Sequence, residues 1–278
     1  MFDKTEKVGH SLIQHGKCNN RIYLMKYDVR DRQYLAKHLF ELAKKKGYGK
    51  IIAKVPKSAC RNFITEGYKS EGEIKHYYKN GESCKFLSKF LCKLRAKSEK
   101  VPIYNEIIKA SHIKKHKKGD SLPGHFHIEI LSECECNNIS SLYKEVFETY
   151  PFPVFDPQYI KDTMKSNVVY FGVFYKKELV GIASGEIDIK EKNAEMTDFA
   201  ILPDCRGKSI SKHLLKTMHL EMRKKGVKTL YSLARAMSLP MNSTFAALGY
   251  NYRGTLINNT QISGKIESMN IWDNSAGV

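Results

Sequence analysis

A short basic turn in the carboxy-terminal half of this 278-residue chain has the composition of a phosphate-binding loop. The turn reads Arg-Gly-Lys-Ser-Ile-Ser over residues 206–211 and separates a strand-like segment from an amphipathic helical one. Free backbone N–H groups, the positive end of a helix dipole and two cationic side chains would meet there. The small residues Gly207, Ser209 and Ser211 let phosphate oxygens approach the main chain closely. The turn therefore predicts a pyrophosphate-binding site.

Regular elements are predicted on both sides of this turn. The pattern after it gives a helix to Leu215, a strand over 226–234, a helix over 241–248 and a further strand from Gly249. The segments predicted before it are a strand over 125–131, helices over 139–150 and 157–164, a hairpin of 168–175 with 179–183, and a strand over 195–202. Helices alternating with strands in this order predict an α/β protein with a mixed sheet.

The order strand, Leu-Pro-x-x-Arg-Gly-Lys, helix resembles the acetyl-CoA loop of the GNAT N-acetyltransferases, whose usual pattern is Arg/Gln-x-x-Gly-x-Gly/Ala. The chain departs from that pattern at Ser209 and Ser211, where the family normally has glycine and glycine or alanine. The resemblance implies a GNAT fold over about residues 125–273, with acetyl-CoA as co-substrate and no metal. The cofactor contacts it implies are Ile201, Leu202, Arg206, Gly207, Lys208, Ser209, Ile210, Ser211, Asn242 and Phe245. A simple helix N-cap is the alternative role of Asn242.

Five further segments look very much like the β-lysine N6-acetyltransferase family. They are Phe-Pro-Val-Phe-Asp-Pro at 152–157, Asn-Ala-Glu-Met-Thr-Asp-Phe-Ala at 193–200, Ala-Arg-Ala at 234–236, the Gly-Tyr-Asn-Tyr-Arg-Gly segment at 249–260 and Glu-Ser-Met-Asn-Ile-Trp at 267–272. This resemblance implies acetylation of the terminal amine of (S)-β-lysine, giving N6-acetyl-β-lysine, a compatible solute of osmoadaptation. It also implies a metabolic link to lysine 2,3-aminomutase and is compatible with a homodimer. The rival enzyme reading is an acetyltransferase for another small amine, such as a polyamine or lysine.

Two carboxylates are candidates for the base that such a reaction requires. An alkyl ammonium has a pKa of about 10.4, so the nucleophilic amine is scarce at neutral pH and a base is needed, directly or through water. Glu195 stands where histone-acetyltransferase-like members keep a glutamate on the fourth strand, and we favour it. Asp198 follows three residues later and faces the other side of a regular strand, unless the bulge usual in this strand turns it inward. Phe245 replaces the tyrosine that many members use as general acid, so the proton donor to the leaving thiolate stays open.

A diamino acid also requires charged partners away from its reacting amine. Arg235 at a strand end is the candidate for the substrate carboxylate, and the candidates for the second ammonium are Glu186, Asp188 and Glu267. A purely structural role for Arg235 is the alternative. We expect Trp272 in the last strand to be a core residue.

Most of the positive charge lies in the amino-terminal half. The formal net charge of the chain is +18, and residues 1–120 contribute +17 of it. Such a field attracts anionic ligands such as CoA, and polyanions non-specifically. No helix-turn-helix, RNP or zinc-finger signature accompanies it, so we expect no dedicated nucleic-acid binding. A solvated surface is the simplest alternative, and a non-catalytic basic binding module with a degenerate CoA loop is the rival function from another class.

A Gly-Tyr-x-x-x-Gly pattern at residues 67–72 occurs again at 249–254, and Lys-Gly at 46–47 is matched at 225–226. These spacings suggest an internal duplication, with chance similarity as the alternative. In the first copy the helix after Tyr27–Tyr34 opens without a glycine-rich basic loop.

We therefore predict three parts. Residues 1–117 form a smaller, degenerate GNAT-like α/β domain without acetyl-CoA, 118–124 a linker, and 125–278 the catalytic GNAT domain.

Composition limits the remaining possibilities. A hydrophobic content of 42% with 11% aromatic residues is that of a globular protein. No apolar run approaches a membrane span and the first residues lack a signal-peptide core, so we expect a cytoplasmic protein without membrane association. Seven cysteines without Cys-x-x-Cys favour reduced thiols, and we expect the His-x-His at 125–127 and Cys-x-Cys at 134–136 to be strand residues rather than zinc ligands.

Overall fold

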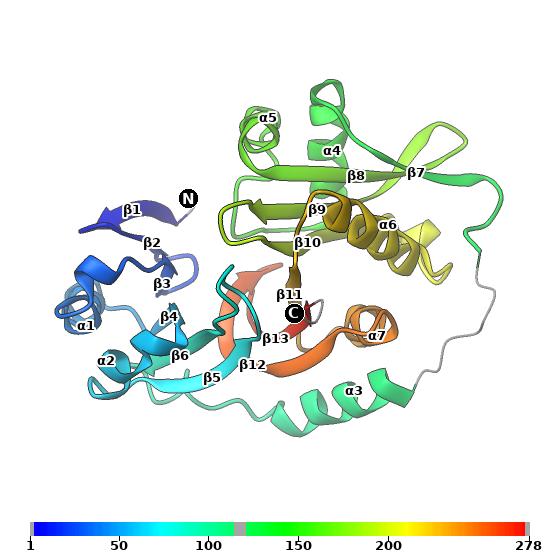
Figure 1. Cartoon of the computed structure of the whole chain (residues 1–278). Coiled ribbons are helices and arrows are strands. Elements are labelled where there is room, and N and C mark those ends of the chain that lie inside the picture. Colours follow the sequence, from blue (N-terminus) through cyan, green and yellow to red (C-terminus); the bar gives the residue numbers. More distant parts are fainter. Residues whose placement is uncertain (1–2, 114–120, 276–278) are drawn as a thin grey trace.

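The computed structural model describes residues 3–113 and 121–275, and all strands within these residues belong to one mixed sheet (Figure 1). The amino-terminal half, residues 3–113, contains β1 (Lys4–Val8), β2 (Ser11–Gly16), β3 (Arg21–Lys26), α1 (Leu35–Lys46), β4 (Lys50–Pro56), α2 (Cys60–Ile64), β5 (Lys69–Ile74), β6 (Cys84–Phe90) and α3 (Val101–Ile113). The carboxy-terminal half, residues 121–275, contains β7 (Phe126–Ile130), α4 (Cys136–Val146), α5 (Pro157–Ser166), β8 (Val168–Tyr175), β9 (Glu178–Asp188), β10 (Asn193–Ile201), α6 (Ile210–Lys224), β11 (Thr229–Arg235), α7 (Leu239–Ala247), β12 (Asn251–Ile262) and β13 (Lys265–Ser275). No helix in these described ranges is long and apolar enough to cross a membrane.

The two halves repeat one strand order. The amino-terminal order is β1-β2-β3-β4-β6-β5, and the carboxy-terminal order is β8-β9-β10-β11-β13-β12 with β7 added beside β8. Each half has a single parallel pair, β3 with β4 and β10 with β11, and its crossover contains one long helix, α1 or α6. The repeated spacing in the sequence thus coincides with a repeated topology.

The halves join through two glycines of the repeated pattern. Gly72 of β5 pairs with Gly254 of β12, the equivalent position of the other copy. A Cβ at Gly72 would lie 2.8 Å from the carbonyl oxygen of Arg253, and one at Gly254 would lie 2.2 Å from that of Glu71. Only glycine permits this approach of the two backbones. The division at 118–124 stays a prediction, since residues 114–120 lie outside the described ranges.

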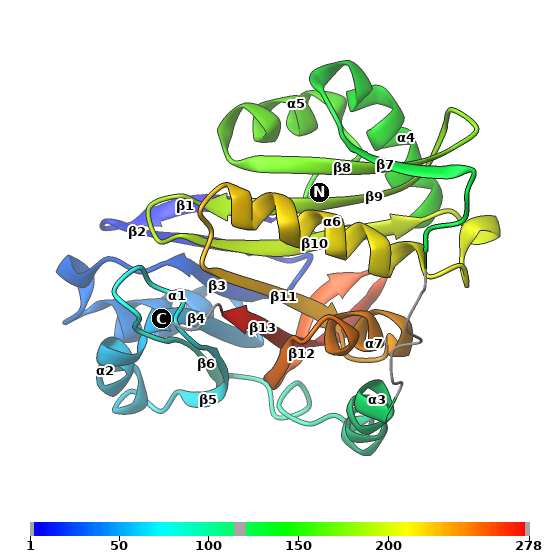
Figure 2. The same ribbon diagram turned by 45° about the vertical axis from the view of Figure 1, so that its right-hand side comes forward.

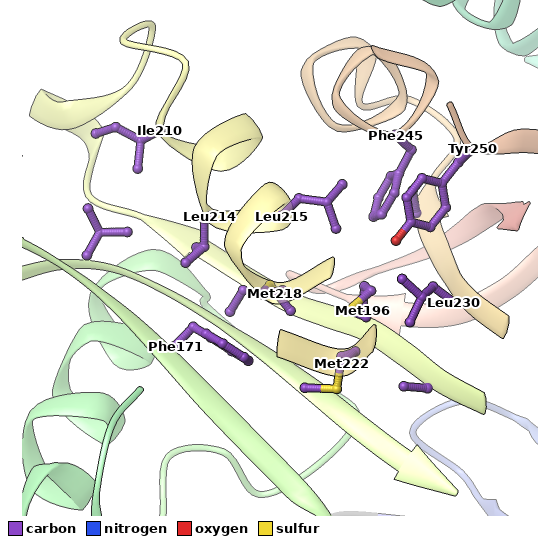
Figure 3. Packing of buried hydrophobic residues seen from close by; sticks show 14 of the residues in the cluster. Phe171, Met196, Ile210, Leu214, Leu215, Met218, Met222, Leu230, Phe245 and Tyr250 are labelled. Carbon is purple, nitrogen blue, oxygen red and sulfur yellow. The ribbon is translucent and has the colours of Figure 1, made fainter. Parts of the chain in front are cut away.

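Helices cover both faces of the carboxy-terminal sheet (Figure 2). On one face α6 packs its Leu214, Met218 and Met222 against Phe171 and Met196 of the strands (Figure 3). On the other face α4 and α5 cover β8, β9 and the end of β10. This packing fixes the start of α6 relative to β10, and therefore fixes the turn between them.

One face of the amino-terminal sheet packs against the carboxy-terminal half instead of a helix. Residues of β4 alternate, so that Ile51 and Ala53 join the core under α1, whereas Ile52 points the other way. Ile52 shares a cluster with Leu256 and Ile271 of the carboxy-terminal half. Lys54, two residues after Ile52, belongs to this same inner face.

Most predicted elements are confirmed, with three differences in length and one in type. Helix α6 continues to Lys224, beyond the predicted end at Leu215, because Met218 and Met222 stay packed in the core. Cys134 and Cys136, predicted as strand residues, lie in a 3-10 turn and at the start of α4.

Helix α4 ends at Val146 rather than at residue 150, because Phe147 adopts extended backbone with φ −116° and ψ 121°. Strand β9 continues to Asp188, beyond the predicted end at residue 183. Pairing with β10 extends β9 through this segment and keeps it in the sheet.

Candidate active site

The basic turn leads into α6 without a side-chain cap. Gly207 has φ +79° and Ser209 has φ +58°, so two left-handed residues turn the chain into the helix. The N-cap Ser209 makes no side-chain hydrogen bond to the first turn of α6. The first N–H groups of the helix therefore point outward, as an anion site requires. A left-handed serine is strained, which is the structural consequence of its departure from glycine.

The two cations of the turn have different surroundings. Arg206 donates from Nε to the carbonyl oxygen of Ile201, 3.0 Å away, and lines the adjacent cavity. Lys208 instead donates to the carbonyl oxygen of Asp204, 3.1 Å away, and lies 5.6 Å from the centroid of the Phe126 ring. Lys208 does not line the adjacent cavity, and its contact with the phosphates stays a prediction.

A cavity of about 880 Å³ extends from this turn between β10, the end of β11 and α7. It has the size of a pocket for a large cofactor. Among the predicted cofactor contacts, those that line it are Ile201, Arg206, Gly207, Ser209, Ile210 and Ser211. Leu202 and Phe245 are not in its lining. Sequence reasoning missed Lys212 and the α7 residues Met241, Ser243 and Thr244, because the facing side of α7 depends on tertiary packing.

Asn242 has a structural place instead of a position in this cavity. It is fully buried, and its amide nitrogen donates to the carbonyl oxygens of Arg235 and Ser238. Its amide oxygen accepts from Asn270 and from Trp272 Nε1. The N-cap of α7 is Ser238, whose hydroxyl oxygen accepts a hydrogen bond from the N–H of Met241. The alternative N-cap role of Asn242 is therefore wrong. The side-chain hydrogen bonds of Asn242 are made within the protein, and Trp272 is a core residue as expected.

A second cavity of about 90 Å³ adjoins the first, and the two share Phe147, Phe199, Arg235, Ser238 and Met241 in their linings. It lies where β10 and β11 diverge, since their last paired residues are Glu195 and Tyr231. Its polar lining includes Tyr150, Thr197, Asp198 and Ser232, and Phe245 contributes to its apolar wall.

Asp198 faces this small cavity because β10 is irregular there. The strand register shifts between Thr197 and Ala200, and Asp198 has φ +57°. Its carboxylate accepts hydrogen bonds from Tyr150 Oη, Ser184 Oγ and Thr197 Oγ1. Burial raises the pKa of Asp198, although these three bonds oppose the rise. The anticipated bulge is therefore present, and it turns the carboxylate inward.

Glu195 lies two residues before Thr197 in β10, and the two side chains therefore share one face of the sheet. Its neighbours across the sheet are Glu186 of β9 and Tyr231 of β11. Burial, followed by repulsion from Glu186, raises the pKa of Glu195 to about 7, against the opposing attraction of Lys54. A carboxyl group with such a pKa takes up or releases a proton near neutral pH.

Arg235 is paired inside the protein. Its Nη2 donates to Glu267 Oε1, 2.8 Å away, and its Nε is buried without a hydrogen-bond partner in the described part of the chain. Glu186 is exposed, while Asp188 lies 4.0 Å from the ammonium of Lys26. The four charged residues predicted for the substrate thus form two groups, Arg235 with Glu267 beside the cavities and Glu186 with Asp188 on β9.

Comparison with known proteins agrees with this geometry. Residues 136–250 match the model of the acetyltransferase (GNAT) family. A β-lysine N(6)-acetyltransferase from Methanococcus maripaludis is 38% identical over 98% of this chain and 98% of its own length. The chain belongs to the GNAT acetyltransferase family. A β-lysine N(6)-acetyltransferase from Methanosarcina mazei is 33% identical over 86% of this chain and 95% of its own, and the N-acetyltransferase YodP from Bacillus subtilis is 34% identical over 94% of each chain.

Family membership confirms the predicted fold class and the predicted type of enzyme. The protein is a GNAT N-acetyltransferase, and its acetyl donor is acetyl-CoA. Its GNAT domain is preceded by the additional α/β region of residues 3–113. Its acceptor is a small-molecule amine.

Proposed function

We propose that this enzyme transfers the acetyl group of acetyl-CoA to the N6 amine of β-lysine in the cytoplasm, giving N6-acetyl-β-lysine. Two relatives that carry this activity in their names align with most of the chain. The observation that supports the proposal most directly is the pair of adjoining cavities, one beginning at an uncapped helix start and the other lined by the carboxylate of Asp198. A reaction that isomerises lysine, such as that of lysine 2,3-aminomutase, would supply the acceptor.

Acetyl-CoA fits the larger cavity with its pyrophosphate at residues 206–211. The free N–H groups at the start of α6 and the guanidinium of Arg206 would hold the phosphates. The pantetheine arm would then pass between α7 and β10 to the divergence of β10 and β11. Diverging strands leave backbone groups unpaired, and these would hold the thioester.

We propose Glu195 as the group that receives the proton of the acceptor ammonium. The carboxylate of Asp198 already accepts three hydrogen bonds, which stabilise its charged form, whereas the pKa of Glu195 is about 7. Thr197, next on the same face, lines the small cavity, so a water molecule could connect Glu195 to an amine bound there. Asp198 is then a positioning residue that fixes Tyr150 and Ser184.

Electron pairs and protons balance in one direct transfer. The neutral amine attacks the thioester carbon, the C–S bond breaks, the nitrogen releases its remaining excess proton to water, and CoA leaves as a thiolate toward the larger cavity. Phe245 has no proton to give, and so we propose that water protonates the thiolate. Arg235 donates a hydrogen bond to Glu267 and lines both cavities, and we propose that it forms part of the boundary between them.

The decisive experiment measures thiol release from acetyl-CoA with β-lysine, α-lysine, spermidine or no acceptor. A high rate with β-lysine alone, and mass-spectrometric location of the acetyl group on N6, would support the proposal. Turnover that favours spermidine or α-lysine would transfer the assignment to that amine. Absence of turnover with every amine, together with salt-sensitive RNA binding, would instead favour the basic binding module.

A further inference from the structure

The amino-terminal half places one ammonium group close to the proposed base. Lys54 lies on the inner face of β4, with its Nζ 5.5 Å from the ring centroid of Tyr77 and 6.0 Å from that of Tyr23. The Tyr77 ring in turn lies 5.5 Å from the ring of Tyr231, the cross-strand neighbour of Glu195. A continuous row of side chains therefore leads from Lys54 of one half to Glu195 of the other.

Lys54 has aromatic neighbours and no acidic partner. Within residues 3–113 and 121–275 no carboxylate forms an ion pair with its ammonium, and none of the described cations forms one with Glu186. Burial lowers the pKa of Lys54, but Tyr23, Tyr77 and Glu195 outweigh it and keep the pKa above its ordinary value. The side chain is therefore charged at neutral pH, and this charge is available to a ligand carboxylate.

Glu186 offers the complementary charge on the same face. It is exposed and stands directly opposite Glu195 in the pairing of β9 with β10. An ammonium group between Glu186 and Lys54 would meet a carboxylate on one side, while the carboxylate of the ligand, two carbon–carbon bonds from the ammonium-bearing carbon of β-lysine, would meet Lys54. This arrangement matches the zwitterionic end of an amino acid.

We propose that Lys54 of the amino-terminal half binds the carboxylate of the acceptor, and that Glu186 of β9 binds the ammonium nearest to it. This inference rests on the proposed function and deepens it. The reacting amine then lies at the small cavity beside Thr197, two residues along β10 from Glu195. Two residues of a strand span roughly 7 Å, which the Glu195 side chain and one water molecule bridge, and an extended six-carbon diamino acid is long enough to reach from there to Glu186.

The proposal gives the amino-terminal half a task in substrate selection. Acetyl-CoA contacts would come wholly from the carboxy-terminal half, whereas the far end of the acceptor would be bound between the halves. An amine without a carboxylate, such as a polyamine, would leave Lys54 unpaired and would be disfavoured.

Three acceptors and three variants test this assignment on the full-length enzyme. The acceptors are β-lysine, 6-aminohexanoic acid, which lacks the second ammonium, and 3,6-diaminohexanamide, which lacks the carboxylate. The variants are Lys54→Met, Glu186→Gln and the control Lys26→Met, which removes an exposed lysine 4.0 Å from Asp188 at the same junction. Ratios of kcat/KM between acceptors are compared within each variant, so that an altered pKa of Glu195 cancels.

Lys54→Met and Glu186→Gln should change the ratios of kcat/KM between acceptors in different ways. Lys54→Met should lower kcat/KM by about 10- to 100-fold for the two carboxylate acceptors relative to the amide, the effect of one lost charge-assisted bond. Glu186→Gln should lower it for β-lysine and the amide relative to 6-aminohexanoic acid. Lys26→Met should change neither ratio.

Equal losses for all three acceptors in Lys54→Met, with unchanged ratios, would overturn the proposal and leave Lys54 as a residue that only orders Glu195. The Kd for acetyl-CoA, measured by calorimetry, should be unaltered in every variant and shows that each one is folded. Failure of the proposed function is separable, because the wild-type enzyme would then acetylate none of these amines.

Discussion

The two halves have the same strand order and opposite chemistry at the start of their long helix. Before α6 the chain has Arg206 and Lys208 and a helix start without a cap. Before α1 it has Asp28 and Asp31, and the carboxylate of Asp31 accepts hydrogen bonds from the N–H groups of His10 and Ser11. The amino-terminal half thus contains its own anion at this end, and a phosphate would be repelled there.

A second pair of equivalent positions differs in the same way. Lys50 follows Gly47 by three residues, as Thr229 follows Gly226, so these two positions correspond. In the parallel pairing Lys50 lies beside Arg21 and Thr229 beside Asn193. Two residues further along each strand, Tyr23 therefore corresponds to Glu195. The position that holds the proposed base in one half holds a tyrosine in the other. The repeated core preserves the topology, and we propose that a few residues such as Glu195, in place of Tyr23, decide which half is catalytic.

The largest expected effect comes from removing the base. Glu195→Gln should lower kcat by about 10²- to 10⁴-fold, because a general base contributes that much to proton transfer. Steady-state thiol release with β-lysine measures it. The equivalent change Tyr23→Phe in the other half should leave kcat within a few-fold, and an equal loss in both variants would mean that Glu195 acts only through the packing between the halves.

A smaller effect should follow from placing a carboxylate at the start of α6, as Asp31 is placed before α1. Ser211→Asp puts a carboxylate in the first turn of α6, where it stabilises the helix but repels the pyrophosphate. The Kd for acetyl-CoA should rise by about 10- to 100-fold, the value of one or two charge-assisted bonds. Thermal stability should be retained or increased.

The matched control is Asp31→Asn, which removes the anion of the amino-terminal half. It should lower stability without altering the Kd for acetyl-CoA. A weaker affinity in this variant would show that acetyl-CoA also contacts the first half.

The pattern of the core could be predicted from the sequence, but the site only in part. Alternating apolar residues and the paired glycines at 72 and 254 indicated the strands and the repeat, since these depend on local periodicity and backbone clearance. The turn at 206–211 could be found for the same reason. By contrast, the bond from Tyr150 to Asp198 and the place of Lys54 depend on which segments meet in space. Asn242 was misjudged because its partners, Asn270 and Trp272, come from a strand far along the chain.

The pH dependence of kcat/KM should show whether Glu195 of the carboxy-terminal half acts as the base. Glu195 is active as a base only when it is deprotonated, and since its pKa is about 7, kcat/KM should fall about tenfold per pH unit below this value. The charged and titratable groups near it are Glu186, Lys54, Asp198, Tyr231, Tyr23 and Tyr150. In Glu195→Gln the inflection near pH 7 should vanish, leaving only the rise caused by deprotonation of the free amine. An inflection that persists in this variant would assign it to another group, with Asp198 next to be tested.

The smallest expected effect concerns the residue that makes the α6 turn unusual for its family. Ser209 has φ +58°, and a left-handed residue other than glycine costs about 1–2 kcal/mol. Ser209→Gly should recover part of this strain, although glycine also loses more entropy on folding, so we expect a net gain of less than about 1 kcal/mol in the free energy of unfolding. Urea unfolding with and without acetyl-CoA measures it. If the serine hydroxyl contributes to phosphate binding, the affinity of the glycine variant will fall while its stability rises. If only the backbone binds, affinity and stability will both stay equal or improve, and the departure from the family pattern is then a tolerated strain at the start of α6.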